Sequence, residues 1–337
     1  MPLWFYGDLA KGISVDNNLM VAQSSCQTTD ACGLPKVAEN SAPFESKDVE
    51  SQSIFPINSA MASGLFPIRK KNVPDIKIWA GSSVVIDVDT GTIIHYDDGR
   101  KRTQIASLTK MMTAILVMEN IKDLNEQITI TKEDLRVDGT KVGCPTSVIC
   151  NSNRMYVGEK VYAKDLMKAM LMNSANDSAT ALGTHIAGSS QKFVDMMNYK
   201  AEDMGLKDTH FCTPSGLEID GQEDQCYSTA YDLARIAAYS LKFDTIWDIM
   251  KIPEGQFYSC DGKYMHVLKN TDMLLNTLPG CVGGKTGFTP LAGKSLMLGA
   301  EEPTGKHKII AVLLNDEQRW DDMRTLVNWV FENYKWQ

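Results

Sequence analysis

A serine and a lysine three residues apart, Ser107 and Lys110, have the side-chain types and the spacing that a serine acyl-transfer site requires. A serine hydroxyl is a poor nucleophile until a neighbouring base removes its proton. Residues three apart on a helix lie on one face, so the Lys110 amine can reach the Ser107 hydroxyl. The same spacing recurs at Ser189 and Lys192, and we interpret that second pair as coincidental.

A second motif, Ser174-Ala175-Asn176, interrupts a long run of helix-forming residues. Its ordinary explanation is a polar break between two helices. In a serine enzyme, however, the Ser174 hydroxyl can relay a proton from Lys110. The Asn176 amide can hold that lysine and a substrate carbonyl.

The third motif, Lys285-Thr286-Gly287, follows two glycines. A glycine-rich turn with a surface lysine would have the same composition. On a strand, however, a cation next to a hydroxyl can clamp a substrate carboxylate. Gly287, which has no side chain, would let a peptide lie close against the backbone.

The order S-x-x-K, S-x-N, K-T-G is the signature of the penicillin-recognising serine enzymes. The residues around the three motifs resemble the low-molecular-mass penicillin-binding proteins of the D-Ala-D-Ala carboxypeptidase type, over about residues 77–331. The runs that carry the resemblance are Ala106 to Ala114, Asn173 to Asp177, Phe193 to Ala201, Pro214 to Leu217, Thr229 to Ala234 and Gly284 to Thr289.

The resemblance implies catalytic roles. Ser107 attacks the penultimate D-Ala of a peptidoglycan stem peptide that ends in D-Ala-D-Ala, and water later hydrolyses the acyl-serine. Lys110 is the general base, and Ser174 and Asn176 complete the proton path. A lysine pKa is ordinarily about 10.4. Burial beside Lys285 should lower the pKa of Lys110, because desolvation and a like charge both disfavour the ammonium.

The resemblance also implies how substrate binds. The backbone N–H groups of Ser107 and Phe288 form an oxyanion hole. Lys285 and Thr286 bind the terminal carboxylate, and Arg319 corresponds to an arginine that orients it. β-Lactam antibiotics would be covalent inhibitors at the same serine.

Three related functions remain as alternatives to the carboxypeptidase. Short relatives include endopeptidases that cut D-alanyl cross-links. A β-lactamase shares the motifs but needs a glutamate to activate the deacylating water, and no E-x-x-L-N run follows Asn176. A non-catalytic cell-wall binding protein should lack at least one polar site residue, and here all are present.

Two more distant functions are disfavoured. A phosphate-binding loop that ends in Gly284-Lys285-Thr286 needs a glycine where Pro279 stands. An aspartic protease needs a second aspartate in a setting like that of Asp89-Thr90-Gly91, and no second D-T-G or D-S-G exists. We interpret residues 89–91 as a hairpin turn.

The elements expected to position these motifs are strands at both ends of the chain with helices between them. This pattern predicts an α/β (α+β) sandwich whose sheet is assembled from the two ends. The resemblance specifies a β-lactamase/transpeptidase-like fold, with a mainly antiparallel sheet, flanking helices and an inserted helical region. The expected strands span 78–86, 94–96, 294–299 and 309–314, and the expected helices span 107–120, 163–187, 190–204, a segment from about 228, and 321–334.

Residues 1–71 are rich in Ser, Asn, Ala and Gln with little periodicity. We predict a largely disordered leader or linker there, followed by a serine D,D-peptidase catalytic domain over residues 72–337. The first ten residues have no positive n-region or long apolar run of an export signal. The closing helix is followed at once by Gln337, so we expect no C-terminal membrane anchor.

Eight cysteines without C-x-x-C spacing favour disulfides and an extracytoplasmic location, periplasmic or secreted. The simplest pairing joins sequence neighbours: Cys26–Cys32, Cys144–Cys150, Cys212–Cys226 and Cys260–Cys281. A net charge of −8 does not indicate a basic surface, so nucleic-acid binding is disfavoured. The five histidines show no ligand spacing, so we expect no metal and no organic cofactor.

Overall fold

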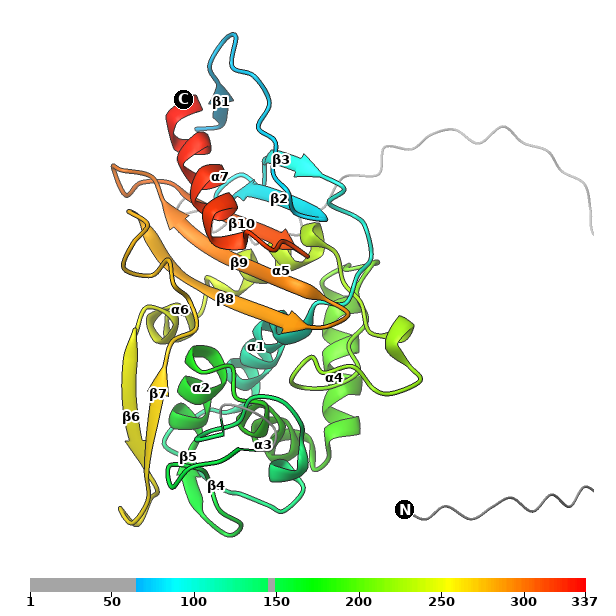
Figure 1. The fold of residues 1–337 in the computed structure, drawn as a ribbon, viewed down its shortest axis with the longest axis vertical. Helices are drawn as coiled ribbons and strands as arrows, with labels where there is room; N and C mark the ends of the chain where they lie inside the picture. Colours follow the sequence, from blue (N-terminus) through cyan, green and yellow to red (C-terminus); the bar gives the residue numbers. More distant parts are fainter. Residues whose placement is uncertain (1–64, 145–148) are drawn as a thin grey trace, which may run out of the picture. The chain divides into compact units, whose positions relative to one another are not determined.

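The computed structural model describes residues 65–144 and 149–337 (Figure 1). Strand β1 (Pro67–Arg69) pairs with the C-terminal strand β11 (Tyr334–Trp336), on the leader side of the predicted boundary at residue 72. Residues 1–64 of the predicted leader, including the proposed Cys26–Cys32 bridge, lie outside the described residues.

One antiparallel sheet of five strands, in the order β3-β2-β10-β9-β8, forms the upper part of the molecule in Figure 1. Two strands precede the helical region and three follow it, which confirms the predicted sheet assembled from both ends of the chain. The turn at residues 89–91 joins β2 to β3, as predicted. The strands are β2 (Ser82–Asp87), β3 (Ile93–Asp97), β8 (Cys281–Thr289), β9 (Gly293–Glu301) and β10 (Lys308–Leu314).

Both faces of the sheet are covered, because successive side chains of a strand point to opposite faces. On β2, Val84 and Ile86 face the helical region, whereas Val85 faces helix α7 (Arg319–Asn333). Helix α5 (Ala230–Ser240) packs on the first face, against β2 and β10. The buried residues of α7 fall at helical spacing toward the sheet: Met323, Leu326, Val327 and Val330.

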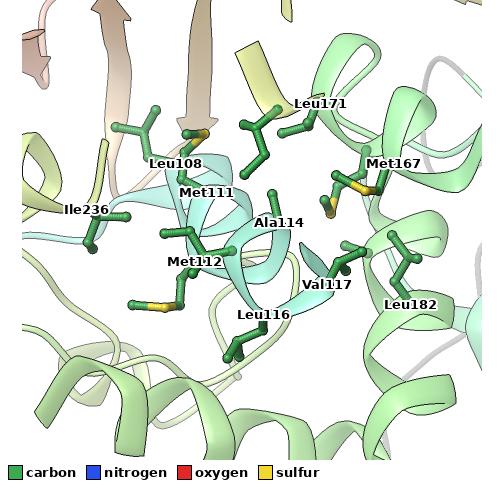
Figure 2. Packing of buried hydrophobic residues seen from close by; sticks show 14 of the residues in the cluster. Leu108, Met111, Met112, Ala114, Leu116, Val117, Met167, Leu171, Leu182 and Ile236 are labelled. Carbon is green, nitrogen blue, oxygen red and sulfur yellow. The ribbon is translucent and has the colours of Figure 1, made fainter. Parts of the chain in front are cut away.

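Helix α1 (Lys110–Asn120) is the centre of the helical region. Its first eight residues are all buried, which fits a helix enclosed on every side. Figure 2 shows its apolar side chains packed against Met167 and Leu171 of α2, Leu182 of α3 and Ile236 of α5. The helices around α1 include α2 (Ala163–Met172), α3 (Asn176–Ala187) and α4 (Ser190–Asp203), and α6 (Asp244–Met250) packs against α2 and β8.

The prediction of one helix over 163–187 was wrong in its middle. The helix stops at Met172 and a new one begins at Asn176, because Ser174 has a positive φ of 58°. Helix α6 and two small antiparallel sheets of two strands each were not predicted. One pairs β4 (Gln127–Thr129) with β5 (Lys160–Tyr162), and the other is the hairpin of β6 (Glu254–Tyr258) and β7 (Met265–Lys269). Among the described residues, no helix has the length and apolarity to span a membrane.

Two of the predicted disulfides are present, Cys144–Cys150 and Cys212–Cys226. The pairing of Cys260 with Cys281 was wrong, since both are free thiols. Cys260 follows β6 on the outer hairpin, where its N–H donates to Lys160. Cys281 opens the edge strand β8 of the main sheet, so nearness in sequence does not bring these two together.

The Cys212–Cys226 bridge closes a loop with a sequence separation of 14 residues. A loop of that size stabilises the folded state by about 3 kcal/mol through the entropy of the unfolded chain. We expect the double variant Cys212→Ser/Cys226→Ser to lose about that much free energy of unfolding, measured in urea. Cys260→Ser is the control and should change it by less than about 0.5 kcal/mol.

Candidate active site

Ser107 lies in a short 3-10 helix, Ala106–Thr109, that leads directly into α1. The predicted α-helix therefore begins at Lys110 rather than at Ser107. In a 3-10 helix the side chains at positions i and i+3 are eclipsed, which still sets the two on one face. The Lys110 Nζ lies 2.7 Å from the Ser107 Oγ.

The Lys110 amine is surrounded by three oxygens. Besides Ser107, its Nζ contacts Asn176 Oδ1 and the backbone oxygen of Ser215, each at 2.7 Å. The side chain is completely buried. A protonated amine can donate to all three oxygens. A neutral amine keeps two donors, for Asn176 and Ser215, and directs its lone pair at the Ser107 hydroxyl proton.

Burial lowers the pKa of Lys110 well below its ordinary value, and the positive charge of Lys285 lowers it further. The charge of Asp177 acts in the opposite direction but more weakly. This is the direction expected from the sequence. A lysine with a lowered pKa can be neutral, and hence a base, near neutral pH.

Lys285 approaches the site from β8 and bridges the sheet to the helical region. Its buried Nζ lies 2.9 Å from Ser174 Oγ and 3.0 Å from the backbone oxygen of Thr286. Burial lowers the pKa of Lys285 to about 7, and the charge of Arg319 contributes. Near pH 7 the Lys285 side chain can therefore be either a cation or a neutral amine.

Ser174 and Ala106 both have positive φ angles, 58° and 46°. For residues other than glycine such a conformation costs on the order of 1–3 kcal/mol. Ala106 precedes Ser107, and Ser174 occupies the break between α2 and α3. The strained residues thus lie at the two places where the chain presents a site hydroxyl.

The Asn176 amide is held by the loop that precedes the Cys144–Cys150 bridge. Its Nδ2 donates to the Asp138 oxygen at 2.7 Å, which directs Oδ1 toward Lys110. Its N–H donates to the Thr140 oxygen at 2.8 Å. The amide orientation is therefore fixed by backbone carbonyls of a distant segment.

The remaining predicted residues lie on or beside β8. Thr286 is buried and its hydroxyl meets that of Thr271 at 2.7 Å, whereas the Phe288 side chain is exposed. Arg319 Nη1 donates to the backbone oxygens of Gly287 and Ser295. Arg319 thus lies against the strand that carries the motif, and it contributes positive charge there.

Gly287 is required by packing within the protein. A Cβ at this position would lie 2.9 Å from the Ile105 oxygen, and next to Leu108 and Ala106. The absence of a side chain therefore lets β8 approach the segment that carries Ser107. The sequence interpretation considered only the approach of a substrate peptide.

The loop between Cys212 and Cys226 was not predicted to belong to the site. Its Ser215 oxygen contacts Lys110, and its Pro214 oxygen accepts a hydrogen bond from Thr113 of α1 at 2.7 Å. Gly216 has a φ of 85°, and a Cβ there would lie 1.9 Å from the Ala106 oxygen. The run Pro214 to Leu217 was visible as part of the family resemblance, but carbonyl groups carry no side-chain signal.

The second S-x-x-K sequence has only a local structural role. Ser189 caps helix α4, its Oγ accepting from the Lys192 N–H at 3.3 Å. Within residues 65–144 and 149–337, no three His, Cys, Asp or Glu side chains group as metal ligands would.

Comparison with known families identifies the class. Residues 69–318 match the model of the D-alanyl-D-alanine carboxypeptidase family, and the chain belongs to that family. The match covers the whole sheet, the helical region and every motif described above.

Similar proteins of known family support this assignment. The chain is 31% identical over 253 residues to the D-alanyl-D-alanine carboxypeptidase DacB2 of Mycobacterium tuberculosis, covering 74% of this chain and 81% of that one. It is 29% identical over 273 residues to DacF of Bacillus subtilis, covering 79% and 65%. This chain thus spans less than two thirds of the Bacillus protein. A D-alanyl-D-alanine endopeptidase of Escherichia coli is 28% identical, covering 66% and 67%.

Solved structures share the fold. A D-alanyl-D-alanine carboxypeptidase from Mycobacterium tuberculosis superposes with a TM-score of 0.67 at 28% identity, covering 78% of this chain and 95% of that one. A penicillin-binding protein from Listeria monocytogenes, in its ampicillin-bound form, gives 0.65 at 28%, covering 77% and 100%. The predicted transpeptidase-like fold is confirmed.

Gly216 and Gly221 provide a matched test of how the loop supports the site. Both have positive φ, but a Cβ at Gly221 meets nothing within 4 Å. Gly216→Ala must push the loop away from Ala106, and a displacement of about 1 Å at a catalytic group can cost about 100-fold in rate. We expect that loss in acylation of Ser107 by a fluorescent penicillin, followed by gel labelling.

Gly221→Ala carries a similar backbone penalty without the contact, so it should label like the unchanged protein. Equal labelling of the two variants would show that the approach of Gly216 to Ala106 is not needed.

Proposed function

We propose that this protein is a penicillin-sensitive serine D,D-carboxypeptidase that removes the terminal D-Ala from peptidoglycan stem peptides. The observation that carries the proposal is the buried Lys110 amine, 2.7 Å from the Ser107 hydroxyl and tied to two further oxygens. A buried amine with a lowered pKa beside a serine hydroxyl suits the role of a base.

In the proposed acylation, Ser107 Oγ attacks the carbonyl carbon of the penultimate D-Ala while neutral Lys110 accepts the hydroxyl proton. The backbone N–H groups of Ser107 and Phe288 stabilise the developing oxyanion. The C–N bond then breaks, and the proton passes from Lys110 through Ser174 to the departing amine of D-Ala. Asn176 keeps the lysine in place through its Oδ1.

Deacylation reverses this proton path. Water replaces the departed amine, loses a proton to the same base and attacks the acyl-serine carbonyl. The products are a peptide shortened by one D-Ala and free Ser107. A β-lactam ring would acylate Ser107 in the same way, but its leaving group stays attached and delays the water.

Selectivity for a free C-terminus is attributed to the positive end of the cleft. Lys285, with a pKa of about 7, gains a proton more readily when an anionic carboxylate binds beside it. The Thr286 hydroxyl, on the next residue of the strand, would be a further donor to that carboxylate. Arg319 adds charge from behind the strand, where its Nη1 lies 2.9 Å from the Gly287 oxygen.

A D,D-endopeptidase is the second candidate, because the Escherichia coli relative carries that name. Its bond would be the D-alanyl cross-link between two stem peptides, cleaved through the same acyl-Ser107. Since peptidoglycan lies outside the cytoplasm, either activity would place the protein there. The two disulfides suit an oxidising compartment.

Intact-mass spectrometry after exposure to benzylpenicillin tests the chemistry. We expect a mass increase of one penicilloyl group on the folded protein and none in Ser107→Ala. Ser189→Ala, at the second S-x-x-K sequence, is the control and should label normally. No adduct on the unchanged protein would refute the proposal, and rapid turnover of penicillin would indicate a β-lactamase.

Release of D-Ala from a pentapeptide, compared with cleavage of a cross-linked dimer, then separates the two peptidases. The proposed carboxypeptidase should act faster on the pentapeptide. Faster cleavage of the dimer would favour the endopeptidase.

The pH dependence of kcat/KM should be bell-shaped, because this ratio reports the ionisation of the free enzyme. The rate rises with pH as Lys110 loses its proton and becomes a base. It falls above about pH 7 as Lys285 loses the charge that binds the carboxylate. Steady-state kinetics on a D-Ala-D-Ala peptide would measure both limbs.

The matching control is the same peptidyl D-alanine as a methyl ester, which yields the same acyl-enzyme without a carboxylate on the leaving group. The fall in kcat/KM above about pH 7 should be smaller for the ester than for the acid. An equal limb for both substrates would contradict the role of Lys285.

A further inference from the structure

Thr271, in the connection between β7 and β8, contacts both the helical region and the main sheet. Its backbone N–H donates to the Met172 oxygen at 3.0 Å, at the C-terminal end of α2 and two residues before Ser174. Its hydroxyl lies 2.7 Å from the Thr286 hydroxyl on β8. A single residue thus links the helical side of the site to the strand that carries the K-T-G motif.

The segment around Thr271 is held without the help of its side chain. Asn270 Nδ2 donates to the Met250 and Ile252 oxygens, each at 2.9 Å, at the end of α6. Asn270 Oδ1 accepts from the Asp272 N–H at 2.9 Å. These bonds fix the backbone, so the Thr271 hydroxyl is presented to Thr286 from a rigid support.

The charges around Thr286 make it important which of the two threonine hydroxyls donates to the other. The carboxylate of Asp272 acts on both Lys285 and Arg319, and it raises their pKa values against the larger effect of burial. An anion bound beside Lys285 therefore meets two cations, a nearby carboxylate and the Thr286 hydroxyl. Thr286 helps only if its proton points toward the anion.

Each threonine hydroxyl has one proton to donate and can accept as well. Two oxygens 2.7 Å apart share one of the two protons. If Thr286 donates to Thr271, its proton is used and its lone pairs face the anion. If Thr271 donates to Thr286, the Thr286 proton is free for the anion, and the two bonds strengthen each other.

We propose that Thr271 is a positioning residue that sets specificity for the free C-terminal carboxylate of the substrate. By donating to Thr286 Oγ1, it turns the Thr286 proton toward the carboxylate that Lys285 attracts. This inference rests on the proposed D,D-peptidase function. Thr271 need not touch the substrate, and the bond-making groups at Ser107 act as before.

Thr271→Val is the direct test, because valine keeps the shape and the backbone N–H but removes the hydroxyl. Thr271→Ser keeps the hydroxyl and should rescue. Thr277→Val is the matched control in the same connection, since the Thr277 hydroxyl is exposed and its hydrogen bonds are to the Met273 oxygen and from Arg324 Nη2, each at 3.0 Å, rather than to a residue of the site. Thermal unfolding of all three reports any loss of structure.

Steady-state kinetics would use two substrates that form the same acyl-enzyme, a peptide ending in D-Ala-D-Ala and the corresponding peptidyl D-alanine methyl ester. Thr271→Val should lower kcat/KM on the acid about tenfold, mainly by raising KM, as for loss of one hydrogen bond to a charged group. The same variant should change the ester by less than about twofold.

Equal losses on acid and ester in Thr271→Val, or full activity on both, would overturn the inference while leaving the peptidase function intact. Failure of the unchanged protein to cleave either substrate would instead refute the proposed function. A drop on the acid that Thr271→Ser does not restore would also contradict the hydroxyl mechanism.

Discussion

The whole site depends on the burial of two lysine side chains, Lys110 and Lys285. A buried ammonium without a compensating charge is strongly disfavoured, so the group loses its proton instead. Neither Lys110 nor Lys285 forms a salt bridge with a carboxylate among the described residues, and burial is the largest cause of both lowered pKa values. Burial thereby makes neutral amines of Lys110 and Lys285 accessible at a lower pH than for an exposed lysine.

Burial of an amine is tolerable only where its hydrogen-bonding positions are filled. For Lys110 the partners come from three distant segments: the turn that carries Ser107, the start of α3 at Asn176, and the loop that contains Ser215. The position of the base is therefore set by the tertiary structure as a whole. Movement of any one segment would leave the amine with an unfilled partner.

The sheet and the helical region supply rigidity for this arrangement in different ways. Strand β8 is held by its pairing with β9 along nearly its whole length, so Lys285 and Thr286 have fixed positions. On the helical side the chain is strained at Ala106 and Ser174, and buried α1 supports the strain through its packing (Figure 2). The two sides of the site are therefore held differently, one by strand pairing and the other by packing around strained residues.

The sequence by itself determined the family, the candidate site residues and the outline of the fold. Ser107, Lys110, Ser174, Asn176 and Lys285 were found from side-chain type, order and spacing, and hydrophobic periodicity located most helices and the central strands. Such signals are local, and short motifs with a required order are informative even when each is weak alone. The residues that sequence reasoning missed contribute mainly backbone groups or supporting contacts.

Only the tertiary structure decided which atoms meet. The Ser215 carbonyl, the close approach of Gly216 to Ala106 and the Thr271 hydroxyl have no sequence signature, because they act through long-range geometry. The Ser174-Ala175-Asn176 motif allowed either a break between two helices or a single helix over 163–187, and the structure shows the break, with a positive φ at Ser174. Cys260 and Cys281 likewise remained apart because they lie on different elements of the fold.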